Sequence, residues 1–129
     1  MISGFEIETA PLSEYEEQHL LPAIRSILCA HVGPMAAITN KKIVALLSPT
    51  HKVNDTRVRK VINHIRNHDL IPCLLATSDG YFVATDEAEV TAYEESLLGR
   101  EMAIKAVRTA IARQKEIKYR GAPVQGTLF

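Results

Sequence analysis

Hydrophobic residues first recur at helical spacing after residue 12 of the chain. Ser13 followed by Glu16 has the capping-box spacing, so a helix is expected to begin there. The apolar residues of this run are Leu20, Ile24, Ile27, Leu28 and His31 or Val32. Gly33-Pro34 should end the helix. Because Pro22 lies inside the run, the pattern predicts either a kink there or a regular helix that starts at this proline.

Two shorter helices are predicted in the next part of the chain. The first covers residues 41–47, for which Thr39 or Asn40 is a suitable N-cap. The second begins after Asn54, another good N-cap, and covers residues 55–68. The predicted buried faces are Ile43, Leu46 and Leu47 in the first helix and Val58, Val61, Ile62 and Ile65 in the second.

The period of the pattern changes after residue 70. Two short β-prone runs, CLLA at 73–76 and YFVA at 81–84, are separated by a polar stretch that ends in Asp79-Gly80. Asp-Gly between such runs is a strong hairpin signal. The sequence therefore predicts a small two-stranded ribbon.

A long helix is predicted from Asp86, an N-cap with Glu89 three residues on, to about Lys118. Its apolar residues are Val90, Tyr93, Leu97, Ile104, Val107 and Ile111, of which Leu97, Ile104 and Ile111 are spaced by sevens. This spacing indicates a homodimer seam, although the same stripe could pack on the first helix. Self-association is favoured because a helix of this length exceeds what a small core needs to cover.

Length and composition favour one domain with two tails. A chain of 129 residues can bury a single core, and 47% hydrophobic residues is ordinary for a globular protein. We expect an N-terminal tail over 1–12, a domain over 13–118 and a flexible tail over 119–129. No membrane span or secretory signal is apparent, so a cytoplasmic protein is expected. Cys29 and Cys73 are expected to be buried free thiols.

The net charge of zero conceals a strong segregation of charge along the chain. Residues 1–36 carry one Arg against five Glu, and residues 37–70 carry seven Lys or Arg against two Asp. Residues 71–99 carry six acids without Lys or Arg, and residues 100–129 carry seven Lys or Arg against two Glu. A basic block can attract a polyanion. The alternative is that the oppositely charged blocks pair within the monomer.

The predicted order is helix, short strand, helix, turn, helix, hairpin and long helix, which is the order of a winged helix. Residues 38–84 carry the pattern, as ITNKKIVALL, NDTRVRKVINHIRNHDLIP and CLLATSDGYFVAT. This segment resembles a winged helix-turn-helix core, and its continuation into a long charged helix resembles small phage and prophage proteins of replication or regulatory regions. The expected fold is thus mainly α, with a small β-hairpin and a long C-terminal helix. The resemblance implies binding of double-stranded DNA in transcription regulation or replication.

The helix over 55–68 is the expected reader of the major groove. Projected at about 100° per residue, its outer face carries Thr56, Arg59, Lys60, Asn63 and Asn67. Arg and Asn can make paired hydrogen bonds to base edges, and Lys neutralises phosphate. The residues expected nearer the DNA backbone are Arg57, His64 and Arg66 beside this face, Lys41 and Lys42 at the preceding helix, and Ser78 at the hairpin tip. Arg59→Ala or Lys60→Ala should then weaken binding without disturbing the fold.

Two other interpretations of this surface remain open. A basic helix face can be merely solvated. A winged-helix fold can also serve as a protein-interaction module, such as a replication adaptor, that does not use DNA.

The C-terminal residues QGTLF form a second candidate binding site. They resemble the pentapeptide by which many bacterial replication and repair proteins dock on the sliding clamp. In that case Leu128 and Phe129 would fill an apolar pocket and the Gln125 amide would make the polar contact. Gly126 replaces the commoner Leu, which should weaken binding. The alternatives are an ordinary frayed terminus and a tail that folds back onto the core.

Catalytic and metal-binding chemistry finds little support in the sequence. His64 and His68 are four apart on a predicted helix, but Ile65 follows His64 where a metalloprotease needs a Glu. We find no phosphate loop, nucleophile elbow or clustered carboxylates. The expectation is a protein without enzymatic activity, metal or cofactor.

Overall fold

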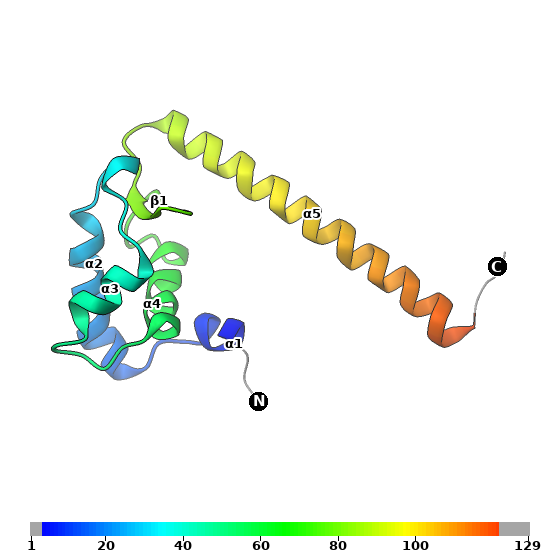
Figure 1. Ribbon diagram of the computed structural model, residues 1–129, viewed down its shortest axis with the longest axis horizontal. Coiled ribbons are helices and arrows are strands. Elements are labelled where there is room, and N and C mark those ends of the chain that lie inside the picture. Colours follow the sequence, from blue (N-terminus) through cyan, green and yellow to red (C-terminus); the bar gives the residue numbers. More distant parts are fainter. Residues whose placement is uncertain (1–3, 122–129) are drawn as a thin grey trace. The chain divides into compact units, whose positions relative to one another are not determined.

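Helices make up most of the chain, and one antiparallel hairpin interrupts them (Figure 1). The computed structural model describes residues 4–121. In chain order its elements are α1 (Gly4–Thr9), the π-helical η1 (Glu16–Leu20), α2 (Leu21–Cys29), the 3-10 turn η2 (Pro34–Ala36), α3 (Asn40–Leu47), α4 (Asp55–Asn67), β1 (Leu74–Thr77), β2 (Gly80–Val83) and α5 (Glu87–Arg120). The expected mainly helical chain with a hairpin and a long C-terminal helix is confirmed. No described helix is long and apolar enough to cross a membrane.

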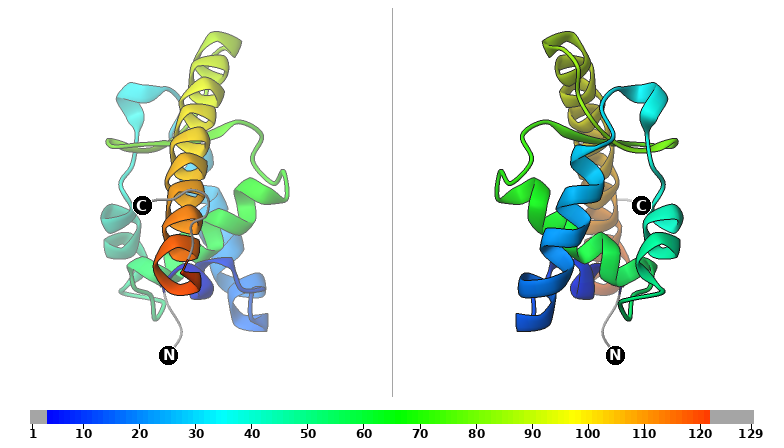
Figure 2. Two further views of the ribbon diagram at one scale, coloured as in Figure 1. Left: turned by 90° about the vertical axis from the view of Figure 1, so that its right-hand side faces the viewer. Right: turned by 90° about the vertical axis from the view of Figure 1, so that its left-hand side faces the viewer.

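The chain divides into two compact units, Met1–Val90 and Thr91–Phe129. The sequence, in contrast, predicted one domain over 13–118. The core of the first unit lies between α2, α3, α4 and the hairpin (Figure 2). All four apolar residues predicted to face the core from α4 are buried, as are Ile43 and Leu47 of α3. The prediction for Leu46 is wrong, since it is 52% exposed and the core lies on the Val44 side of that helix.

The N-caps predicted from the sequence are confirmed. In each case the side-chain oxygen accepts a hydrogen bond from the backbone N–H three residues later, which satisfies a donor that the helix leaves unpaired. The capping residues are Ser13, Thr39, Asn54 and Asp86. These short polar side chains therefore fix where the helical segments begin.

The first long helical segment changes its period at Pro22. The π-helical η1 precedes this proline, which then lies in the first turn of α2. Proline has no N–H to donate and its ring crowds the preceding turn, so a wider turn at this point relieves both problems. Of the two arrangements predicted here, the regular helix with a first-turn proline is present, although it begins at Leu21 and a π-helical turn precedes it. Helix α2 ends at Cys29, before the predicted stop at Gly33.

Three local expectations differ from the structure. The segment expected as an N-terminal tail contains α1, which packs against α4. Cys29 and Cys73 are free thiols as expected, but both are exposed. Cys29 is at the end of α2, away from its buried Ile24 and Leu28, and Cys73 is in the turn before β1 with a φ of 59°. Apolar neighbours in the sequence were therefore a poor guide to the burial of these thiols.

Strand β2 lies between two backbone partners. It pairs with β1 along one edge, with Thr77 opposite Gly80. On its other edge, Tyr81 and Ile38 exchange backbone hydrogen bonds of 2.8 and 2.9 Å. The strand order is therefore the segment at Ile38, then β2, then β1.

Gly80 is required by the close approach of this third segment. Its φ is +121°, and a Cβ placed there would lie 2.4 Å from the carbonyl oxygen of Ile38. Only glycine combines that conformation with such a close backbone contact.

Gly80→Ala should therefore lower the free energy of unfolding by about 2 to 4 kcal/mol, through backbone strain and steric overlap. Urea unfolding followed by circular dichroism measures the change. Gly99→Ala is the matched control, because a Cβ at Gly99 has no atom within 4 Å and helix propensity favours alanine there. Equal stability of the Gly80→Ala variant and the unsubstituted protein would contradict this account of the crossing.

Candidate nucleic-acid interface

The polar face of α4 lies opposite its buried face, as the helical projection predicted. Its five expected residues, Thr56, Arg59, Lys60, Asn63 and Asn67, are all outside the core. Only Asn67 is exposed, and the other four are partly buried. The expectation of a face open to solvent is thus wrong for most of its length, because the N-terminal segment of the same chain lies against it.

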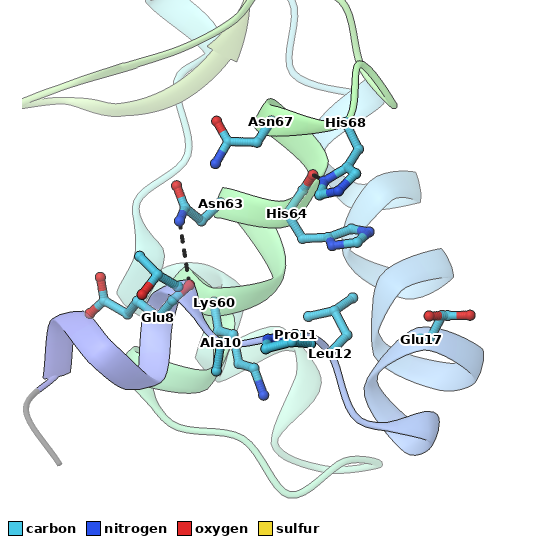
Figure 3. A pocket seen from close by; sticks show the side chains of 11 residues that line it. Glu8, Ala10, Pro11, Leu12, Glu17, Lys60, Asn63, His64, Asn67 and His68 are labelled. Atoms are coloured by element: carbon cyan, nitrogen blue, oxygen red, sulfur yellow. Dashed lines mark hydrogen bonds between the residues drawn. The ribbon is translucent and has the colours of Figure 1, made fainter.

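Helix α1 contacts the α4 face through Glu8. The Glu8 carboxylate accepts a hydrogen bond from Arg59 Nε at 2.9 Å, and its backbone carbonyl accepts one from the Asn63 amide at 3.4 Å (Figure 3 shows the second). The Arg59 side chain is still 42% exposed. An ion pair this accessible is screened by solvent and contributes about 0 to 1 kcal/mol. The contact between Glu8 and Arg59 is therefore a weak one.

Glu16 forms a much more enclosed contact with the same helix. Its two carboxylate oxygens accept hydrogen bonds from Arg57 Nε at 2.9 Å and from Lys60 Nζ at 2.7 Å. The same carboxylate also accepts the Ser13 backbone N–H at 2.8 Å. Glu16 is buried, and the Lys60 side chain is only 13% exposed. Arg57 and Lys60 are thus held in place as structural cations.

The pKa of the Glu16 carboxyl reflects this environment. Burial alone would raise the pKa, but the hydrogen bonds from Lys60, from the Ser13 backbone and from Arg57 outweigh it and lower the pKa to about 2. Glu16 is therefore ionised throughout the neutral range. Removing either partner of such an enclosed pair leaves the other charge unpaired, which is costly. The expectation that Lys60→Ala would leave the fold undisturbed accordingly conflicts with the position of Lys60.

Hollows flank α1 where it meets α4. A cavity of about 330 Å³ lies on one side, between the segment after α1 and the C-terminal half of α4 (Figure 3). A smaller one of about 180 Å³ lies beside Arg59, Asn63 and Tyr81. Both hollows therefore adjoin the contact between α1 and α4, and close packing is incomplete at these two places.

His64 differs electrostatically from the other predicted contacts. Its ring stacks on that of His68 at a centroid distance of 4.0 Å. Burial, and secondly the neighbouring His68, lower the pKa of His64 below its ordinary value. His64 is therefore predominantly neutral at pH 7 and offers hydrogen bonds more than charge. No group of three or more His, Cys, Asp or Glu within residues 4–121 is placed to hold a metal ion.

The remaining predicted contacts lie on neighbouring elements. Lys41 and Lys42 are exposed in the first turn of α3, and Ser78 is exposed at the tip of the hairpin. Asn40 connects these elements, since its amide donates to the Asp55 carbonyl at 3.0 Å and accepts from the Tyr81 hydroxyl at 3.1 Å. The starts of α3 and α4 and the hairpin are thereby linked through one side chain.

The sequence did not identify Glu8 and Glu16 as partners of the α4 cations. The alternative that oppositely charged blocks pair within the monomer did point to such contacts, and three ion pairs confirm it for the first two blocks. The sequence motif at Ser13 and Glu16 predicted only the capping role of that glutamate. Gln125, Leu128 and Phe129 lie outside the described residues.

Comparison of the chain with protein-family models, curated proteins and solved structures gives no match.

The Glu16 contact predicts a pH dependence of stability. The carboxyl pKa is lower in the folded chain than the ordinary 4.5, so its stabilisation is complete above pH 4.5 and is lost as the pH falls toward 2. A shift of this size corresponds to about 3 kcal/mol. Urea unfolding at pH 7 and at pH 2.5 should show this loss, and Glu16→Gln should destabilise the chain at pH 7 and reduce the dependence on pH.

Glu14→Gln is the matched control, because Glu14 is an exposed carboxylate two residues away. It should retain the pH dependence of the unsubstituted chain. If Glu16→Gln and Glu14→Gln unfold alike at both pH values, the enclosed carboxylate does not stabilise the fold.

Proposed function

We propose that the chain is a winged helix-turn-helix protein that binds double-stranded DNA through the polar face of α4, after the duplex displaces α1. The strand order, in which β2 lies between β1 and the segment at Ile38, and the order of the helices are those expected of a winged helix. In that fold α4 is the helix that enters the major groove.

The observation that carries the proposal is that the α4 face already binds oxygen acceptors, both of them from Glu8. A carboxylate oxygen of Glu8 lies 2.9 Å from Arg59 Nε, and the carbonyl oxygen of the same residue accepts the Asn63 amide. A phosphate oxygen or the acceptor edge of a base can take either position. The surface is thus built to hold acceptor oxygens, at the point where the resemblance places the DNA.

The displacement of α1 is energetically feasible. Its ion pair with Arg59 is accessible to solvent, it has hollows beside it, and a helix of six residues has little stability of its own. The Glu16 contact, in contrast, stays intact. The residues available to a duplex are therefore Arg59, Asn63, Asn67, Thr56 and, on α3, Lys41 and Lys42, whereas Arg57 and Lys60 support the fold.

The second candidate is the protein-interaction module, and the burial of Lys60 favours it. A cation that is 13% exposed and hydrogen-bonded to a buried carboxylate cannot be offered to a phosphate without breaking the fold. In this interpretation α4 holds the N-terminal segment permanently. The two candidates make opposite predictions for substitutions at Glu8.

Glu8→Gln should raise the affinity of the full chain for random duplex DNA by roughly two- to five-fold, because it removes an exposed ion pair that competes with DNA. Fluorescence anisotropy measures the affinity, which should fall steeply with added salt. Arg59→Ala should then reverse the gain.

Glu14→Gln makes the same change of charge at a carboxylate outside α1, and should leave the affinity nearly unchanged. Full-length protein and the Glu8→Gln variant that both fail to bind at low salt would favour the interaction module and reject DNA as the ligand.

The C-terminal pentapeptide remains a separate proposal for a protein partner. Deleting residues 125–129 should abolish retention of the chain on an immobilised bacterial sliding clamp and leave its DNA affinity unchanged. The separation is expected because Leu128 and Phe129 supply the apolar contacts, at a distance in sequence from α4. Equal retention of the full-length and shortened chains would remove the clamp as a partner.

A further inference from the structure

Helix α5 carries apolar side chains that are exposed. The helix has 34 residues, and none of them is buried. The members of one stripe are between 41% and 69% exposed, and we call them the α5 stripe: Leu97, Ile104, Val107 and Ile111. Their spacing of seven, three and four residues places them along one side of the helix, as in the seam of a coiled coil. An apolar stripe of this length gains free energy when a partner removes it from water.

Between residues 94 and 117, one edge of the α5 stripe carries charge and the other does not. Along the charged edge, at steps of seven residues, lie Glu94, Glu101, Arg108 and Lys115, all exposed and without ion pairs among the described residues. Along the neutral edge, at the same steps, lie Ser96, Ala103, Ala110 and Ile117. The charged edge is therefore acidic in its first half and basic in its second half.

Two copies of this charge pattern are complementary only when the two α5 helices run in opposite directions. In an antiparallel pair of helices related by a two-fold axis, like edges meet, so the acidic half of one charged edge lies against the basic half of the other. In a parallel pair, each charged edge meets the partner's neutral edge, and the four charges stay unpaired.

The two ion pairs that an antiparallel arrangement allows require the same register of the two helices. Glu101 with Arg108 and Glu94 with Lys115 are both centred midway between Ile104 and Lys105. One two-fold axis at that point satisfies both pairs in both copies. The midpoint between Ile104 and Val107 lies one residue from this axis, so these two side chains are near the centre of the seam.

We propose that α5 is a self-association surface on which a second copy of this chain binds antiparallel, with Glu101 of each copy opposite Arg108 of the other. The proposal does not rest on DNA binding, since no residue of α4 takes part. Arg100 and Gln114 interrupt the apolar seam on either side of its centre, so the charged edge has a large share in fixing orientation.

Sedimentation equilibrium of the full chain tests the pairing. The chain should dimerise, and Arg108→Glu should raise the dimer dissociation constant at least ten-fold, because it places two carboxylates opposite each other. Adding Glu101→Arg to Arg108→Glu should restore dimerisation by exchanging the partners. Arg113→Glu and Glu95→Arg are matched controls on the opposite side of the helix and should leave the constant unchanged.

Spin labels test the orientation in a chain whose two exposed thiols are removed by Cys29→Ser and Cys73→Ser. A label at Glu95→Cys should report about 30 Å between the two copies, since each label lies roughly ten residues from the axis at 1.5 Å per residue. A label at Lys105→Cys, beside the axis, should give a short distance in either orientation.

A chain that stays monomeric at all concentrations would overturn the proposal, as would a dimer that Arg108→Glu leaves unaffected. A short distance between the labels at position 95 would show a parallel dimer and would equally overturn it.

Discussion

The buried carboxylate of Glu16 is the contact on which the arrangement of the first unit depends. It accepts the Ser13 backbone N–H and receives Arg57 and Lys60 from α4, so it fixes a helix start and binds that start to a second helix. A charge taken out of water in this way is tolerated only when its hydrogen-bonding capacity is filled. Three donors, from Ser13, Arg57 and Lys60, fill the capacity of the Glu16 carboxylate. Two of them are cations that the sequence pattern assigned to DNA contacts.

The N-terminal segment therefore binds α4 with two different strengths. At Glu16 the contact is enclosed, whereas at Glu8 it is accessible to water and flanked by hollows. Solvent screening separates the two, since the same pair of charges interacts several times more strongly in a protein interior than at its surface. The part of the α4 face near Arg59 and Asn63 is consequently the part that a ligand could occupy.

Local rules predicted the elements well and the long-range contacts poorly. The N-caps at Thr39 and Asn54, and the buried face of α4, follow from side chains within four residues of one another. The contact between α1 and α4 joins parts of the chain 51 residues apart, as the Glu8–Arg59 ion pair shows, and neither periodicity nor capping can indicate it. Charge counting by block gave the correct sign of that attraction without its location. The sequence thus predicted which residues form the polar face of α4, but not that the N-terminal segment lies against them.

The amide of Asn40 has a mechanical consequence for this unit. It joins the first turns of α3 and α4 to the hydroxyl of Tyr81, whose backbone is itself bridged to Ile38. Lys42 and Ser78 accordingly lie on elements that are joined to one another by hydrogen bonds. A molecule that touches both must match the spacing between them, and a misfit can be absorbed by bending of the bound molecule, so its own deformability enters the selectivity of recognition.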